Sequence, residues 1–429
     1  MTATAVFMFG GLMGLMLVGV PVAFALFAIA ISTLLMAGGG DWSALGLVPS
    51  TIWDSVTNFT LTAVPLYILM GAIIAASGMG ARLYSAIATL SAGLPGSLAV
   101  ATTIACAVMA AISGSSVATA AAIGRFSVSE MRRFGYRESD ACGAVAAGGT
   151  LGILIPPSIP MIVYGVIAEE SVGKLFMAGI LPGLLLALLF GGYQMWLART
   201  RVSTMAQSAR MGPVSLADRA RALVEILPMA ALIAIILGSI YTGIATPTET
   251  AAIGVAVSLL LALGLYRELD WRKCRMILME TGRGSIMVLA IIAGAMLFGY
   301  ALTTTDVAPT LSRAVAGADL PPWLVFIAIN LLLLFLGCFL ETLSIIVITT
   351  PIIIPIIETF GWDKVWFGVI LMINMEMALI TPPVGLNLFV VKGVVPEVPL
   401  GRIIAGTLPY VLIMALALAL VAVLPQVFI

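Results

Sequence analysis

The chain has 429 residues, of which 62% are hydrophobic and 9% are charged, with 20 basic against 20 acidic side chains and no histidine. A soluble domain carries about 25% charged residues, so this composition excludes an ordinary soluble protein and predicts an all-α polytopic membrane protein. The zero net charge gives no field that attracts nucleic acid, and we expect no nucleic-acid partner.

Apolar segments that are long enough to cross a bilayer follow one another along the chain. Two of them carry small or polar residues halfway, which are costly on a lipid-facing helix. We predict that these two form re-entrant helical hairpins, at 95–130 and 321–357, with their tips buried in protein. The other ten are predicted spans. In chain order the apolar cores are 3–19, 21–37, 58–77, 96–124, 141–167, 175–198, 228–244, 248–266, 284–303, 323–357, 366–391 and 403–428.

Double prolines interrupt two of the predicted spans. Pro156-Pro157 lies within 141–167, and Pro382-Pro383 lies within 366–391. Proline removes a backbone donor and disfavours the helical conformation of the residue before it. Each of these helices is therefore predicted to break at mid-membrane, which frees carbonyl oxygens and presents the N-terminus of a half-helix.

The proline punctuation recurs after a shift of 226 positions. Pro21 aligns with Pro247, since 247 − 21 = 226. The same register aligns Leu94-Pro95 with Leu320-Pro321, Pro156-Pro157 with Pro382-Pro383 and, after a one-residue slip, 178–182 with 405–409. Each half contains five spans and one hairpin, and five is odd, so the second half must be inverted. Paired inverted repeats with broken helices are typical of secondary transporters, whose binding site lies near the midplane.

The predicted domain organisation follows from this repeat and from the positive charges. Residues 1–198 form the first inverted repeat, 199–227 an amphipathic cytoplasmic connector, and 228–429 the second inverted repeat. Sixteen Lys and Arg residues then fall in cytoplasmic segments against three in outward loops, in agreement with the positive-inside rule. Both termini are expected in the periplasm. The cytoplasmic segments are 79–95, 131–140, 199–227, 267–283 and 392–402.

Small polar side chains gather at the hairpin tips and at the helix breaks. Together with freed carbonyl groups they supply hard, neutral oxygen ligands, which suit Na⁺. Close helix packing by small residues is the alternative explanation, but the recurrence of both clusters at symmetric positions favours ion binding. The first predicted Na⁺ site draws on Ser113, Ser115, Ser116, Thr150 and Gly152. The second draws on Glu341, Thr342, Thr381, Gly385 and Asn387.

Three intramembrane carboxylates need explanations of their own. Glu341 could ligate Na⁺, carry a proton or cap backbone amides, and we rank the structural, capping role slightly ahead. Glu249 follows Pro247 in the sequence Thr-Pro-Thr-Glu, and both are predicted to be structural residues at a helix start. Glu376 could serve either purpose. If uptake follows a pH gradient and ignores Na⁺, Glu341 or Glu376 becomes the proton carrier.

Four motifs together resemble the large membrane subunit of the TRAP (tripartite ATP-independent periplasmic) transporters. They are Ser113-Gly-Ser-Ser-Val-Ala-Thr-Ala-Ala-Ala-Ile-Gly124, Gly149-Thr-Leu-Gly-Ile-Leu-Ile-Pro-Pro-Ser158, Thr246-Pro-Thr-Glu249 and Thr381-Pro-Pro-Val-Gly-Leu-Asn387. The resemblance covers essentially the whole chain. It implies an elevator-type ion-transporter architecture, in which a transport domain of hairpins and broken helices slides against a scaffold. The expected substrate-binding residues are Ser116, Pro156, Pro157, Ser158, Pro382 and Pro383.

The resemblance also implies partners and a cellular place. We expect Na⁺-coupled import of an organic acid, such as a C4-dicarboxylate or a sialic acid, across the bacterial inner membrane. The expected partners are a small four-helix membrane subunit and a soluble periplasmic substrate-binding protein. A stand-alone sodium/dicarboxylate carrier is the first alternative. An intramembrane enzyme is disfavoured, because the chain has no histidine and no credible carboxylate pair.

Overall fold

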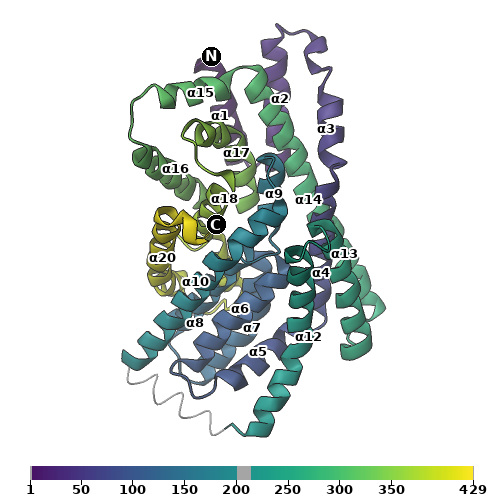
Figure 1. Cartoon of the computed structure of the whole chain (residues 1–429), viewed down its shortest axis with the longest axis vertical. Coiled ribbons are helices and arrows are strands. Elements are labelled where there is room, and N and C mark those ends of the chain that lie inside the picture. Colours follow the sequence, from purple (N-terminus) through teal and green to yellow (C-terminus); the bar gives the residue numbers. More distant parts are fainter. Residues whose placement is uncertain (1, 201–213, 429) are drawn as a thin grey trace.

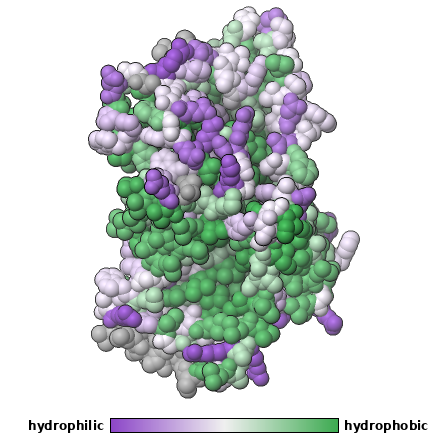
Figure 2. Space-filling model, in the orientation of Figure 1, coloured by the Kyte–Doolittle hydropathy of each residue, from purple (hydrophilic) through white to green (hydrophobic). Residues whose placement is uncertain are grey.

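The computed structural model describes residues 2–200 and 214–428, and within these ranges the ordered elements are all helices. Seven of the described helices are long and apolar enough to cross a membrane. Figure 2 shows a broad apolar band across the visible face, with polar residues gathered above it and along the lower edge. The predicted class, an all-α polytopic membrane protein, is confirmed.

The first half of the chain contains ten described helices and three short 3-10 turns. The helices are α1 (Thr2–Leu17), α2 (Val22–Ala37), α3 (Val48–Val56), α4 (Ala63–Ala76), α5 (Met79–Ser91), α6 (Ser97–Ser113), α7 (Ser116–Arg133), α8 (Glu138–Thr150), α9 (Ile159–Ile167) and α10 (Val172–Thr200). The 3-10 turns are η1 (Trp42–Leu45), η2 (Phe59–Thr62) and η3 (Leu151–Ile153).

The second half resembles the first in part of its order of elements, although one long helix, α14 (Trp271–Thr304), stands where the first half has α3 and α4. Its helices are α12 (Leu216–Tyr241), α13 (Pro247–Leu260), the π-helical η5 (Leu261–Tyr266), α14 (Trp271–Thr304), α15 (Val307–Ala316), α16 (Pro322–Gly337), α17 (Thr342–Thr359), α18 (Lys364–Leu379), α19 (Leu386–Val394), α20 (Leu400–Val423) and α21 (Pro425–Phe428). The starts of α7 and α17 are 342 − 116 = 226 residues apart, and those of α8 and α18 are 364 − 138 = 226 residues apart. The predicted proline register thus has a counterpart in the helix boundaries.

Helical structure extends into segments that the charge pattern assigns to the cytoplasm. Most of 79–95 is the helix α5, and α14 begins at Trp271, well before the predicted span 284–303. The start of α14 is capped by Asp270, whose carboxylate accepts a hydrogen bond from the backbone N–H of Lys273 at 2.7 Å. Basic residues mark the place where a helix leaves the apolar layer, but the helix itself continues through them.

Two pairs of consecutive helices occupy the positions of the predicted hairpins. The helices α6 and α7 meet at Gly114, whose φ of +59° is left-handed, and a Cβ there would lie 2.8 Å from the carbonyl oxygen of Pro157. The helices α16 and α17 meet across the segment 338–341. Figure 1 shows α6 and α7 toward one end of the long axis and α16 and α17 toward the other.

Both double prolines interrupt the helices as their chemistry requires. The helix α8 ends at Thr150 and α9 begins at Ile159, while α18 ends at Leu379 and α19 begins at Leu386. The Pro156-Pro157 and Pro382-Pro383 peptide bonds are both cis. Of the predicted connector 199–227, residues 201–213 lie outside the described residues, and the part from Leu216 onward is the beginning of α12. The division into inverted repeats and a connector stays a prediction.

Candidate functional site

The first hairpin tip lies directly against the first helix break. The backbone N–H of Ile159 donates to the carbonyl oxygen of Gly114 at 3.4 Å, which joins the start of α9 to the tip. A Cβ at Gly152 would lie 2.6 Å from the carbonyl oxygen of Ser115, so only glycine permits this approach. The tip and the break therefore form one packed unit in which main-chain oxygens come close together.

The hydroxyl groups of this tip bond to one another and to the start of α7. The hydroxyls of Ser113 and Thr119 lie 2.8 Å apart, and the backbone N–H of Ser115 donates to Ser113 Oγ at 3.4 Å. Ser115 Oγ accepts from the backbone N–H of Ala118 at 3.4 Å and so caps α7. Ser113 Oγ also donates to the carbonyl oxygen of Ser115 at 3.3 Å. A hydroxyl oxygen has two lone pairs, so Ser115 Oγ, which accepts one bond, keeps acceptor capacity for a further ligand.

Thr150 and Ser158, at the two ends of the first break, have their hydroxyl groups engaged with main chain. Thr150 donates to the carbonyl oxygen of Ala147 at 2.7 Å. Ser158 donates to the carbonyl oxygen of Ile153 at 2.6 Å and accepts from the backbone N–H of Met161 at 3.4 Å. Both side chains are fully buried. The structure thus shows Ser158, a predicted substrate ligand, as the N-cap of α9.

The second tip and the second break are joined in the same way. The backbone N–H of Val384 donates to the carbonyl oxygen of Cys338 at 3.2 Å. Glu341 occupies the N-cap position of α17, and its Oε2 accepts a hydrogen bond from Ser344 Oγ at 3.4 Å. Thr342 follows it and is buried. This geometry places the carboxylate at a helix N-terminus, where negative charge is favoured.

The second break itself contains one bonded hydroxyl and one left-handed glycine. Thr381 Oγ1 donates to the carbonyl oxygen of Met377 at 2.6 Å. Gly385 has φ +58°, and a Cβ there would lie 2.9 Å from the carbonyl oxygen of Thr381. The carbonyl oxygen of Thr381 thus lies close to Gly385, the residue that directly precedes α19.

Asn387 connects the two halves of the molecule. Its Nδ2 donates to Ser116 Oγ at 2.7 Å and to the carbonyl oxygen of Ala146 at 3.2 Å. The side chain is fully buried, and Oδ1 has no hydrogen-bond partner among the described residues. The sequence grouped Asn387 with the second hairpin, but the structure places its side chain against the first. Asn387 and Ser116 are 271 positions apart in the sequence, so their contact forms only when the two halves pack together.

The two breaks differ in their exposure although they correspond in sequence. Pro156 and Pro157 of the first break are buried. In the second break Pro382 is half-buried, and Pro383 and Val384 are exposed. Of the four prolines predicted to contact substrate, only those of the second break are therefore accessible in this conformation.

The two predicted structural residues lie at the start of α13. Pro247 occupies the first turn, and Thr246 and Glu249 form a reciprocal capping box in which the backbone N–H of Thr246 donates to Glu249 Oε2 at 2.8 Å. The buried hydroxyl of Tyr67 in α4 donates to the carbonyl oxygen of Pro247 at 3.0 Å. The motif thus shapes a helix end and fastens it to a neighbouring helix.

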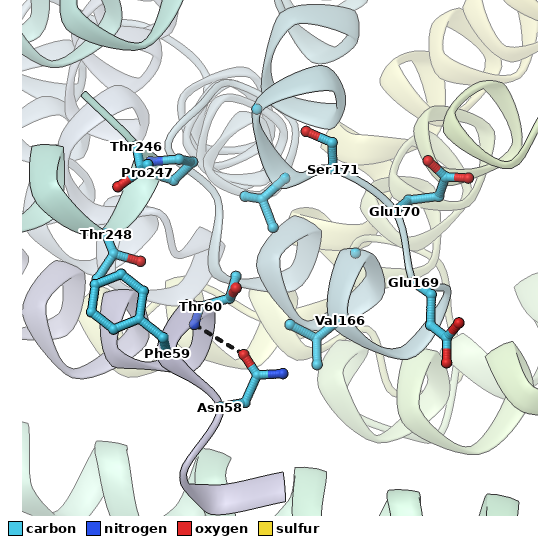
Figure 3. A pocket seen from close by; sticks show the side chains of 13 residues that line it. Asn58, Phe59, Thr60, Val166, Glu169, Glu170, Ser171, Thr246, Pro247 and Thr248 are labelled. Carbon is cyan, nitrogen blue, oxygen red and sulfur yellow. Dashed lines mark hydrogen bonds between the residues drawn. The ribbon is translucent and has the colours of Figure 1, made fainter. Parts of the chain in front are cut away.

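A pocket of about 430 Å³ lies beside this helix end, where η2 and the connection between α9 and α10 approach it. Figure 3 shows Thr246, Pro247 and Thr248 on one side, with Glu169 and Glu170 on the connection across from them. Pro247 is the one predicted site residue in its lining. Three lining residues belong to the motif that begins at Thr246, which the sequence indicates only as a helix start, so the pocket itself was not predicted.

Comparison with known proteins identifies the class of this fold. The chain aligns with the crystal structure of the YdaH transporter of Alcanivorax borkumensis with a TM-score of 0.66 over 90% of each chain, at 14% identity. At this identity the likeness shows the fold alone, which the chain shares with that protein.

The family follows from the sequence relatives. Residues 9–427 match the family described as "Tripartite ATP-independent periplasmic transporter, DctM component". The chain is 40% identical to the C4-dicarboxylate TRAP transporter large permease protein of Pseudomonas aeruginosa, over 88% of this chain and 87% of that protein. It is 31% identical to the sialic acid TRAP transporter large permease protein of Vibrio cholerae, over 97% and 95%. The chain belongs to the DctM family of TRAP transporter large permease proteins.

Proposed function

We propose that this chain is the permease subunit of a Na⁺-coupled importer of a small organic acid in a bacterial inner membrane. Family membership supports the transport role, and the named substrates of two relatives, C4-dicarboxylates and sialic acid, support a carboxylate as cargo. We further propose that a small four-helix membrane subunit and a periplasmic substrate-binding protein complete the transporter, as the tripartite name of the family implies.

The unpartnered oxygen of Asn387 is the observation that carries the Na⁺ proposal. A fully buried amide oxygen without a hydrogen-bond donor is costly, and a cation removes that cost. The oxygens of Ser113, Ser115 and Ser116 are neutral and lie in the unit that Asn387 contacts. These residues fit a hard cation. They would hold Na⁺ at the junction between the first hairpin and the second helix break, with Thr150 and Gly152 beside it.

A second Na⁺ site is proposed at the other tip. Glu341 and Thr342 begin α17, and Thr381 and Gly385 lie in the break that is bonded to this tip. The carboxylate of Glu341 would supply the one charged oxygen of this group. The two sites therefore differ in charge, although they occupy related places in the two halves.

The main-chain bonds between tip and break support an elevator mechanism. Ile159 is bonded to Gly114, and Val384 to Cys338, so each hairpin is fastened to the broken helix of its own half. We propose that these four elements move as one body that carries the acid past the remaining helices. The exposed Pro383 and the half-buried Ser115 and Thr381 would then contact the substrate.

The test is reconstituted uptake with labelled organic acids. The chain with both partner subunits in liposomes should accumulate a carboxylate when Na⁺ is higher outside, and should not when K⁺ replaces Na⁺. The chain alone should transport nothing measurable. Uptake by the chain alone would favour the stand-alone carrier, and uptake that follows a pH gradient without Na⁺ would refute sodium coupling.

A further inference from the structure

Among the buried side chains that have an atom without a hydrogen-bond partner in the described part of the chain, one is an acid. Glu376 lies in α18, about one turn before the helix ends at Leu379, and its side chain is fully buried. Neither of its carboxyl oxygens has a hydrogen-bond partner among the described residues. A buried charged carboxylate without partners costs far more than a buried neutral group. The surroundings therefore determine whether the Glu376 side chain is charged or neutral.

Helix geometry gives the direction in which Glu376 points. Asn374 donates to the side chain of Asn330 at 3.0 Å, and Gly337 contacts Ala378, so this side of α18 faces α16. Glu376 is two residues from Asn374, which turns it by about 200° around the helix. It therefore faces away from α16.

The opposite side of α18 packs on the long helices. A Cβ at Gly368 would lie 2.6 Å from the ring of Tyr164 in α9 and 2.8 Å from Leu175 in α10. Trp366 Nε1 donates to the carbonyl oxygen of Val421 in α20 at 3.2 Å. At about 100° of rotation per residue, Glu376 points between the direction of Gly368 and that of Trp366. Glu376 thus lies on the side of α18 that is turned toward α10 and α20, which both pack on α18.

Several charged and titratable groups of the surrounding helices are bonded to residues other than Glu376. Arg402 of α20 pairs with Glu138 of α8 at 2.6 Å, and Lys364 pairs with Glu358 at 2.7 Å. Tyr164 donates to a main-chain oxygen, and Tyr410 accepts from Gln194. The remaining such groups on the helices packed against α18 are Lys174, Tyr193 and Arg199 of α10, Asp140 and Cys142 of α8, Glu341 of α17 and Lys392 of α19. No ion pair among the described residues includes Glu376.

The repeat supplies an independent comparison. Position 376 corresponds to Thr150 of the first half, since 376 − 226 = 150. There a neutral hydroxyl donates to the carbonyl oxygen of Ala147, one turn back. This position thus holds a neutral hydroxyl donor, that of Thr150, in the first half. A protonated carboxyl group of Glu376 is the neutral equivalent in the second half. A cation is disfavoured at this point, because the carbonyl oxygens of Met377 and Ala378 already accept hydrogen bonds from the backbone N–H groups of Ile380 and Thr381. The side chains of the adjacent Met375 and Met377 supply no hard ligand.

We propose that Glu376 is a proton-binding site of this permease, and that its carboxyl group carries a proton in the conformation described. The proton comes from water when the site is hydrated, and it returns to water when the site is hydrated again. The proposal concerns the state of one side chain, and it stands whether or not Na⁺ drives transport.

Infrared spectroscopy of the purified full chain tests the proposal directly. The wild-type protein at about pH 7 should show the carbonyl band of a protonated carboxyl group, because an ordinary glutamate with a pKa of about 4.3 is ionised there. Growth on ¹³C-labelled glutamate should shift the band, and this assigns it to glutamate without any mutation. Glu376→Gln should remove the band. Glu341→Gln is the matched control, and it should leave a glutamate band in place.

Three outcomes would overturn the proposal. The first is the absence of a protonated glutamate band in the wild-type protein at neutral pH. The second is a band that disappears in Glu341→Gln and persists in Glu376→Gln. If Glu376→Gln does not fold, the labelled wild type and Glu341→Gln still decide, because a glutamate band must then survive the loss of Glu341. A melting temperature that loses its dependence on Na⁺ in Glu376→Gln would indicate a bound cation and would also refute the proton.

Discussion

Asn387 and Ser115 carry the first prediction, because each offers an oxygen to the proposed cation near the first tip. Removal of one hydrogen bond or ligand to a charged group costs about 1.5–3 kcal/mol. Asn387→Ala and Ser115→Ala should therefore each raise the Na⁺ concentration for half-maximal uptake by about ten- to a hundredfold. Uptake by the complete transporter against external Na⁺ is the measurement.

A buried hydroxyl in the same hairpin provides the control for these variants. Thr102 Oγ1 donates to the carbonyl oxygen of Leu98 within α6, far from the tip. Thr102→Val should leave the Na⁺ dependence unchanged. An unchanged Na⁺ dependence in Asn387→Ala would mean that the open amide oxygen has no part in ion binding.

Glu397 gives a prediction about acid stability. It lies between α19 and α20, where a backbone N–H and the guanidinium of Arg132 in α7 hold the pKa of its carboxyl group below the ordinary value. A lowered pKa stabilises the folded state above the unfolded pKa of about 4.3, and this contribution is lost as the pH falls through the folded pKa. Glu397→Gln should thus melt lower than wild type at neutral pH, and the difference should close in acid.

The melting temperature in detergent from about pH 7 to pH 3 tests this linkage. Glu225→Gln, a charge removal at an exposed position of α12, is the control and should not reproduce the effect. If the difference in melting temperature between wild type and Glu397→Gln grew in acid, the predicted direction of the pH dependence would be wrong.

Contact between helices of different halves is closest where α8 crosses α20. A Cβ at Gly143 would collide with the carbonyl oxygen of Gly406, and a Cβ at Gly406 with that of Ser139. Overpacking of this kind costs about 1–3 kcal/mol. Gly143→Ala should therefore lower the melting temperature, whereas Gly401→Ala, near the start of α20 with open space around it, should leave it equal or raise it. If Gly143→Ala and wild type were equally stable, the helices at this crossing would shift apart at little cost in free energy.

The elements most readily predicted were those that proline and glycine mark. The breaks at Pro156 and Pro382 and the turn at Gly114 follow from backbone chemistry that acts within a few residues. Pairing between distant residues has no such local signal. The contact of Asn387 with Ser116 and the pocket beside Pro247 arise only when the helices of both halves pack together.

The inversion of the two halves is tested by access from the two sides of the membrane. Ser115→Cys and Phe339→Cys place thiols at the first and second tips, at half-buried and exposed positions respectively. The four native cysteines should first be replaced. An impermeant thiol reagent should then label position 115 mainly from the cytoplasm and position 339 mainly from the periplasm. Leu216→Cys, exposed at the start of α12, marks the predicted cytoplasmic side. Labelling of both tips from one side would contradict inverted repeats.

The joints between tips and breaks have a consequence for how such a protein can diversify. Both bonds, from Ile159 to Gly114 and from Val384 to Cys338, run between peptide groups. Every residue carries that carbonyl group, and every residue except proline carries that N–H. Side chains at positions 159, 338 and 384 can therefore be exchanged without loss of the fastening, except for proline at 159 or 384, which removes the donor. Gly114 is different, because its left-handed conformation favours glycine. A lineage can in this way change the side chains near the breaks while the hydrogen bonds that join each tip to its break persist.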